Sequence, residues 1–123
     1  MEQTENFIQQ SIVMWFINHY CLRCHKPQCL IMAIPNGGKR DAREAKMMKN
    51  TGLLPGASDL EIIIPGKTIY VEVKTPRGVQ SDEQKEFQQR VESLGFEYHL
   101  VRSLEEFKSI IDEQYINATR RVS

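Results

Sequence analysis

The chain has 123 residues, of which 26% are charged, and its 16 basic and 16 acidic side chains cancel to a formal net charge of zero. This length suits one compact core and is too short for two, and the balanced charge excludes a polyelectrolyte tail. The sequence shows no signal peptide and no run of about 20 apolar residues, so we expect an intracellular protein with no membrane partner. We predict one domain over residues 1–115 and a flexible tail over 116–123.

The first predicted element is a helix over residues 4–20. Thr4 is a suitable N-cap, and apolar side chains recur at the spacing of one helix face at Ile8, Ile12, Trp15 and Phe16. Glu5 borders this stripe and can therefore reach inward, although the helix dipole alone also explains a glutamate in the first turn.

A short apolar strand over residues 29–34 comes next and ends in the turn-forming segment Pro35-Asn36-Gly37. Asn36 suits a turn because its side chain can bond the nearby backbone. Residues 40–50 favour a helix that Gly52 would end. Basic side chains crowd this stretch and could face either nucleic-acid phosphates or solvent: Lys39, Arg40, Arg43, Lys46 and Lys49.

Two alternating runs around Pro65-Gly66 predict a β-hairpin over residues 53–74. If Pro65 and Gly66 form the whole loop, Ile64 pairs with Lys67 and Asp59 lies opposite Glu72. Because side chains alternate between faces, one face is apolar and forms core, with Leu60, Ile62, Ile64, Ile69, Val71 and Val73. The other face is polar and is a candidate site, with Asp59, Glu61, Tyr70, Glu72 and Lys74.

The facing carboxylates of Asp59 and Glu72 weaken a hairpin unless a counter-charge lies near them. Oxygen ligands without paired histidines favour Mg²⁺ or Mn²⁺ over zinc, and these ions also bind phosphate oxygens. Lys74 lies roughly 6.6 Å further along the same face, where it could hold a scissile phosphate and an attacking water. The simpler alternative is a solvated sheet face on which Glu72 and Lys74 form an incidental surface pair.

The segment after the hairpin carries two helix-starting signals. Ser81-Asp-Glu-Gln84 is a capping box that predicts a helix ending near Gly95, so Gln84 has a complete structural explanation. The predicted buried face of this helix is Phe87, Val91 and Leu94. Residues 96–100 alternate as a strand, and a second capping box, Ser103-Leu-Glu-Glu106, begins a last helix.

Strands interleaved with helices predict an α/β fold, here a mixed sheet of about four strands flanked by helices on both faces. The hairpin strands are antiparallel. The last strand follows a helical crossover, so we expect it to lie parallel to its neighbour.

Three cysteines and a histidine form a separate pattern, Cys21-Leu-Arg-Cys24-His25 followed by Cys29. The spacing matches both covalent haem attachment and zinc chelation, but the sequence lacks the export signals that haem attachment needs. A structural zinc that clamps the first helix to the first strand is an alternative to reduced intracellular thiols.

An ordered set of motifs runs along nearly the whole chain: Glu5-x-x-x-Gln9, Pro35-Asn36-Gly37, Gly56-x-x-Asp59, Glu72-x-Lys74 and Ser81-x-x-Gln84. This set resembles the VRR-NUC family of the PD-(D/E)xK nuclease superfamily, a small nuclease domain found in phages and as the catalytic part of larger DNA-repair nucleases. The resemblance implies a restriction-endonuclease-like α/β core and a metal-dependent DNA endonuclease, cytoplasmic in a bacterial or phage-infected cell.

The resemblance also implies a role for each motif. Asp59, Glu72 and the carbonyl of Val73 would coordinate Mg²⁺ or Mn²⁺, and Glu5 would complete the site directly or through water. Lys74 would position the nucleophile, with Glu5 and Gln84 as further catalytic residues. The residues expected near DNA are Asn36, Lys39, Arg40, Arg43 and Arg77.

Members of this family are similar to junction resolvases, which form homodimers that place two sites on one branched DNA. The implied activity is structure-selective cutting of Holliday junctions or other branched DNA. A dimer face needs exposed apolar surface, and the candidates are Met47, Met48, Leu53 and Leu54. Nicking of ordinary duplex is one alternative, and a catalytically silent DNA-binding or assembly subunit on the same scaffold is another.

Overall fold

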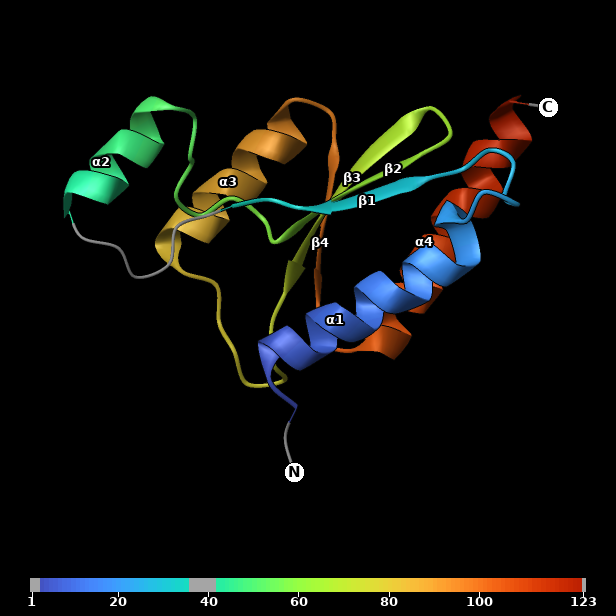
Figure 1. The fold of residues 1–123 in the computed structure, drawn as a ribbon, viewed down its shortest axis with the longest axis horizontal. Coiled ribbons are helices and arrows are strands. Elements are labelled where there is room, and N and C mark those ends of the chain that lie inside the picture. The colour runs from blue at the N-terminus through green and yellow to red at the C-terminus, as the bar shows by residue number, and fades with distance from the viewer. Residues whose placement is uncertain (1–2, 36–41, 123) are drawn as a thin grey trace.

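The computed structural model of the chain describes residues 3–35 and 42–122, and its elements follow the predicted order (Figure 1). The helices are α1 (Glu5–Phe16), which continues as the π-helical turn η1 (Ile17–Cys21), α2 (Ala42–Asn50), α3 (Asp82–Ser93) and α4 (Leu104–Val122). The strands are β1 (Leu30–Ala33), β2 (Leu60–Ile64), β3 (Lys67–Val73) and β4 (Glu97–Val101).

The four strands form one mixed sheet in the order β1-β2-β3-β4, as the α/β prediction requires. β1 and β2 pair antiparallel, β2 and β3 pair antiparallel, and β3 and β4 pair parallel. Ile64 lies opposite Lys67 and Leu60 lies opposite Val71, so the predicted hairpin register is confirmed. Pro65 and Gly66 are the whole loop, and Gly66 has a φ of 67°, a conformation that glycine adopts without strain.

Helices cover both faces of this sheet. α1 and α4 lie against the apolar face of the hairpin (Figure 1), where Ile12, Phe16, Phe107 and Ile111 are fully buried. α3 covers the β3–β4 part of the opposite face, because the Phe87 ring packs against the rings of Tyr70 and Tyr98. α3 therefore covers part of the polar face of the hairpin.

Two predicted features differ in the structure. α4 continues to Val122, past the predicted start of the tail at residue 116, because Ala118 is 7% exposed and belongs to the core cluster. Leu94, predicted on the buried face of α3, follows the end of that helix and is 74% exposed. The apolar spacing Phe87, Val91, Leu94 predicts a buried face that runs one turn further than the part of α3 that contacts the sheet.

α2 lies away from the sheet, at the far end of the molecule from α4 (Figure 1). Asn36, Lys39 and Arg40, predicted to lie near DNA, fall outside the described residues. In the described parts of the chain, no helix has both the length and the apolar character that a membrane crossing requires.

Candidate active site

Asp59 lies immediately before β2 and is hydrogen-bonded to β3 on one side and to the residue that follows β1 on the other. Its Oδ2 accepts a hydrogen bond of 2.7 Å from the backbone N–H of Val73, and its carbonyl accepts one of 2.9 Å from Ile34. One step beyond the Leu60–Val71 pair, the hairpin register brings Asp59 opposite Glu72. The predicted pairing of the two carboxylates is therefore the geometry that the hairpin produces.

Gly56 explains why this loop approaches α3 so closely. Its φ is +86°, and a Cβ placed on it would lie 2.5 Å from the backbone C and O atoms of Glu83. Any other residue would meet both a strained conformation and a clash with the first turn of α3. The Gly56-x-x-Asp59 motif thus couples the position of one carboxylate to the helix that carries Gln84.

Glu72 is a buried carboxylate, with only 1% of its surface exposed. Its Oε2 accepts a hydrogen bond of 2.9 Å from Gln84 Nε2, whereas its Oε1 has no hydrogen-bond partner among the described residues. Burial, followed by the charge and the close side-chain interaction of Asp59, raises the pKa of Glu72 to about 8; the charge of Lys74 opposes this shift and the charge of Glu5 adds to it. The alternative of a solvated surface pair is therefore wrong for Glu72.

Gln84 serves the helix and the site with different atoms. Its backbone N–H donates to Ser81 Oγ and its Oε1 accepts from the backbone N–H of Ser81, which completes the predicted capping box. The amide nitrogen that remains donates to Glu72, two residues before Lys74. Since the cap fixes the side chain, it also fixes the direction of the hydrogen bond to the carboxylate.

Lys74 and Glu5 are the remaining predicted residues of this site, and both act on Glu72 through their charges. Lys74 is half-buried directly after β3 and forms no ion pair with any described residue, while its charge lowers the pKa of Glu72. Glu5 is exposed in the first turn of α1, and its charge reaches the same carboxyl group. Asp59, Glu72, Gln84 and Lys74 thus lie at one end of the hairpin, and Glu5 acts on Glu72 through its charge.

Arg102 belongs to this region, and sequence reasoning missed it. Its Nη1 donates to the carbonyls of Thr75 and Gly78, at 2.7 Å each, and to that of Pro76 at 3.3 Å. The parallel pairing of β4 with β3, extended by a bond of 3.0 Å from Lys74 N–H to the Val101 carbonyl, brings Arg102 here. No local motif marks it, so only the strand pairing could have revealed it.

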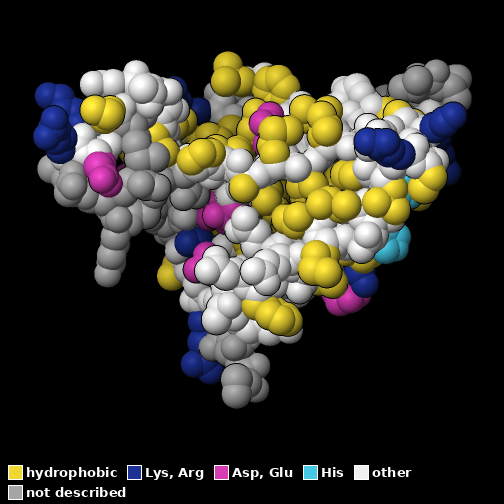
Figure 2. Space-filling model, in the orientation of Figure 1, with side chains coloured by type: hydrophobic (Ala, Val, Ile, Leu, Met, Phe, Trp, Pro, Cys, Tyr) yellow, Lys and Arg dark blue, Asp and Glu magenta, His cyan; other side chains and the backbone are white. Residues whose placement is uncertain are grey.

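Two of the residues predicted to contact DNA are exposed cations in the structure. Arg43 lies on α2, and Arg77 lies on the loop after β3 that Arg102 holds. Figure 2 shows Lys and Arg side chains on the part of the surface formed by α2. Neither Arg43 nor Arg77 forms an ion pair with a described residue, so both remain available to an anionic partner.

The side-chain atoms that could bind a cation in this site are carboxylate oxygens, and oxygen ligands suit a hard divalent cation. Asp59 and Glu72 supply two neighbouring carboxylates, and Glu72 Oε1 is an acceptor for which the described residues provide no donor. A magnesium-sized ion binds through one or two carboxylates and completes its shell with water and phosphate oxygens. Within residues 3–35 and 42–122, no three or more His, Cys, Asp or Glu side chains gather as a metal-binding group.

The absence of a metal-binding group among the described residues also applies to the cysteine motif. Cys21, Cys24 and Cys29 are free thiols that range from exposed to buried. His25 Nδ1 already accepts a hydrogen bond of 2.9 Å from the backbone N–H of Leu22. In this geometry the four side chains do not form a zinc site among the described residues.

Comparison with known proteins supports the fold. A solved structure described as a "VRR_NUC domain protein" superposes with a TM-score of 0.74, covers 96% of this chain and 92% of its own, and is 21% identical in sequence. No protein-family model matches the sequence, and no curated protein matches it. The chain therefore has a VRR-NUC-like fold over almost its whole length.

Proposed function

We propose that this chain is a metal-dependent DNA endonuclease that hydrolyses phosphodiester bonds. The observation that carries the proposal is the buried Glu72, whose Oε1 lacks a partner among the described residues, next to Asp59 and Lys74. A carboxylate pair with one adjacent lysine is a costly arrangement for a structural role, since buried like charges oppose folding. A VRR-NUC-like fold, which a VRR_NUC domain protein shares, supports the proposal.

Asp59 and Glu72 would hold Mg²⁺ or Mn²⁺, together with the carbonyl of Val73, and Glu5 would contribute directly or through a water. A cation bound there lowers the pKa of a coordinated water and offsets charge on the phosphate oxygens. The hydrogen bond from the Val73 N–H aims the Asp59 carboxylate, and the one from Gln84 aims Glu72. Both carboxylates are therefore oriented before any ligand arrives.

Lys74 would hold the attacking water and stabilise the charge that grows on the phosphate. An ammonium without an ion-pair partner among the described residues keeps its hydrogen-bond donors for these oxygens. Arg77 on the next loop and Arg43 on α2 would bind DNA phosphates, as would Lys39, Arg40 and Asn36. These contacts position the backbone and carry no sequence preference.

The substrate we propose is branched DNA, such as a Holliday junction, cut by a homodimer. Exposed apolar side chains on the edge strand β1, Leu30 at 55% and Met32 at 39%, give a second copy a surface to cover. On the side of the molecule that Figure 2 shows, hydrophobic side chains gather over the middle of the surface, where β1 runs in Figure 1. Of the residues predicted for a dimer face, Met47 and Leu54 are exposed and Leu53 is half-buried, and the Met48 side chain lies outside the described set.

The dimer has its own test in sedimentation across micromolar concentrations. The unchanged protein should sediment as a dimer, and Met32→Glu should shift it toward the monomer because a charge would be buried at the contact. Ile116→Glu, at an apolar side chain of α4 that is 49% exposed, is the matched control and should leave the dimer intact. A monomer at every concentration would overturn this part of the proposal.

Cleavage assays test the chemistry directly. End-labelled four-way junction, flap and linear duplex DNA should be cut with Mg²⁺ or Mn²⁺ and left intact with EDTA. Asp59→Ala and Lys74→Ala should each lower cleavage by at least about 100-fold, with far-UV circular dichroism unchanged. The control is Lys85→Ala, which removes an exposed lysine of α3 and should cut at the rate of the unchanged protein. Full cleavage by both site variants would reject the mechanism, and binding without cutting would indicate a silent DNA-binding subunit.

A further inference from the structure

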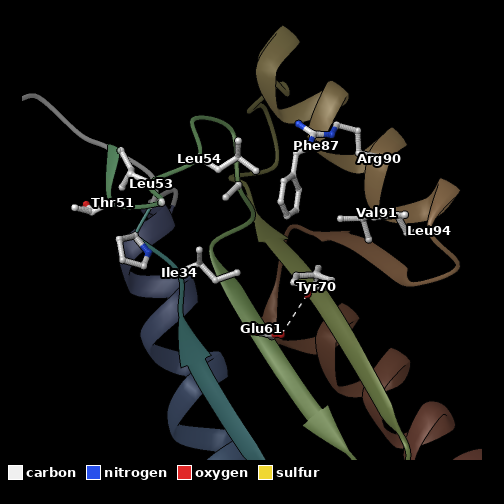
Figure 3. A pocket seen from close by; sticks show the side chains of 13 residues that line it. Ile34, Thr51, Leu53, Leu54, Glu61, Tyr70, Phe87, Arg90, Val91 and Leu94 are labelled. Atoms are coloured by element: carbon white, nitrogen blue, oxygen red, sulfur yellow. Dashed lines mark hydrogen bonds between the residues drawn. The ribbon is translucent and has the colours of Figure 1, made fainter. Parts of the chain in front are cut away.

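A cavity of about 520 Å³ lies beside the candidate active site and is not used by the chemistry above. Figure 3 shows it between the end of β1 with the loop that leads to β2 on one side and α3 on the other. Its walls are mainly apolar, with Leu54 from the loop facing Phe87 and Val91 from α3. A small apolar cavity at the edge of a polar site is a common form of ligand pocket.

The floor of the cavity is polar and continues the carboxylate face of the hairpin. Glu61 and Tyr70 are cross-strand partners, and the Tyr70 hydroxyl donates a hydrogen bond of 3.2 Å to Glu61 Oε2. Each lies two residues along its strand from Asp59 or Glu72, which is roughly 6.6 Å on the same face. The cavity floor and the two site carboxylates therefore lie side by side on one sheet surface.

The rim of the cavity carries a positive charge. Arg90 lines the cavity from α3, is exposed, and forms no ion pair with a described residue. Figure 3 shows the Arg90 side chain beside Phe87, whose ring projects from α3 toward Tyr70. One ligand could therefore contact three features of the cavity at once: the Phe87 ring, the hydrogen-bonding floor and the cation at the rim.

We propose that this cavity binds an unpaired nucleobase of the DNA substrate, with Arg90 on the phosphate next to that base. The inference rests on the proposed function and deepens it, because it specifies how a branched substrate is told from duplex. Unpaired bases bind by stacking on aromatic side chains and by hydrogen bonds along their edges. A duplex base could reach the cavity only by leaving its stack, which costs free energy.

A nucleotide accounts for the whole cavity better than an apolar side chain from a second copy would. An apolar side chain would pack against Leu54, Phe87 and Val91, but it would give Arg90 no anionic partner and would add no hydrogen bond to the Glu61–Tyr70 pair. A base presents both donors and acceptors to Glu61 and Tyr70, and its phosphate is complementary to Arg90. The short distance to Asp59 and Glu72 then places the bound base close to the phosphate to be cut.

Binding of flap DNA tests the proposal without relying on cleavage. The probe carries a single 2-aminopurine or a single abasic site at successive unpaired positions, and binding is measured with Ca²⁺ in place of Mg²⁺. One position should change its fluorescence on binding, and an abasic site at that same position should weaken binding about tenfold. Abasic sites elsewhere in the flap should have little effect.

Variants locate that position in the cavity. Leu54→Trp, which fills the cavity, should bind the intact flap about as weakly as the unchanged protein binds the abasic one, and should lose the fluorescence change. Arg90→Ala should weaken binding several-fold, whereas Lys85→Ala, the matched cation on the same helix, should not. Arg90→Ala removes an exposed side chain, so it keeps the test decisive if Leu54→Trp does not fold.

The outcomes separate this inference from the proposed function. Normal binding and cutting with no dependence on base position, and no effect of Arg90→Ala, would overturn the nucleobase site and leave the nuclease standing. No binding to any DNA would overturn both. A flat position scan together with a changed oligomeric state in Leu54→Trp would assign the cavity to contact between copies and would also overturn the inference.

Discussion

Glu72 is a carboxylate that the fold buries almost completely, with one oxygen on Gln84 and the other lacking a hydrogen-bond partner among the described residues. Keeping a buried charge without full pairing costs several kcal/mol, and proteins respond by raising the pKa of the acid. The pKa of about 8 is this response to burial and to the charge of Asp59. A carboxyl group whose pKa is strongly raised, and one of whose own oxygens has no partner among the described residues, is more typical of a functional site than of a scaffold.

The raised pKa of Glu72 predicts that the metal-free protein loses stability as the pH rises from about 4.5 to about 8. In this window the folded protein keeps a proton that the unfolded chain releases, so the free energy of unfolding falls, by an amount on the order of a few kcal/mol. Urea unfolding across this range should show the fall in the unchanged protein and a much flatter profile in Glu72→Gln. Glu86→Gln, an exposed glutamate of α3, is the control. Equal slopes in all three proteins would contradict the assignment.

The same carboxyl group predicts proton release when a divalent cation binds. Since Glu72 is mostly protonated at pH 7 with a pKa of about 8, Mg²⁺ or Mn²⁺ must displace close to one proton to use it as a ligand. Calorimetric titration in buffers with different ionisation enthalpies measures this number. Binding with no proton release, or binding that is unchanged in Glu72→Gln, would show that the cation does not use this group.

At the scale of elements, the hairpin and α3 were predictable and the loop between them was not. A two-residue loop at Pro65-Gly66 leaves one register, so the opposition of Asp59 and Glu72 follows from counting. The capping box defines the start of α3 because both of its hydrogen bonds are local. The loop after β3 has no such local rule, and its shape depends on Arg102 from a strand that follows later in the chain.

Arg102 is predicted to be a positioning residue for Lys74, because it holds the carbonyls of the loop that follows this lysine. Arg102→Ala should lower kcat about tenfold to 100-fold, since a small displacement of a catalytic group has effects of this size. KM and DNA binding should change little. Arg102→Lys should recover only part of the loss, because one ammonium cannot reproduce the guanidinium geometry.

Added guanidinium ion gives this prediction a readout that a general loss of stability would not produce. It should partly restore kcat in Arg102→Ala and have no such effect on the unchanged protein. Arg23→Ala, which removes an exposed arginine between η1 and β1, is the control and should behave like the unchanged protein. A drop in DNA binding with kcat preserved would instead assign Arg102 to the DNA interface.

At the scale of the whole molecule, α4 is held to the sheet and to η1 by contacts between distant parts of the chain. Lys67 at the start of β3 binds both Glu97 of β4 and Gln114 of α4, and Gln114 Nε2 donates to Glu97 at 2.9 Å. On the opposite side of α4, the Tyr20 hydroxyl donates to Asp112 at 2.5 Å. These contacts lie along the half of α4 that precedes residue 116, and the buried Ala118 carries the packing further.

Glu97 gives the acid side of the stability profile. Burial alone would raise its pKa, but the hydrogen bonds and positive charges of Lys67 and His99 outweigh burial and lower it. Its contribution to stability is therefore present above the unfolded pKa of about 4.5 and is lost as the pH falls below that value. Glu97→Gln should move the midpoint of acid unfolding to higher pH when followed by circular dichroism, with Glu113→Gln as the exposed control. An unchanged midpoint would show that this network adds nothing to stability.

The sequence by itself determined the order of elements, the hairpin register that brings Asp59 opposite Glu72, and the parallel last strand. Each depends on local rules, such as loop length, alternation and capping, or on the handedness of a crossover. Only the tertiary structure decided that Glu72 is buried, that Leu94 is exposed, that α4 continues to Val122 and that Arg102 and the cavity lie beside the site. These features arise where α3 and α4 pack on particular parts of the sheet, and spacing within one element carries no information about which distant surface will cover it.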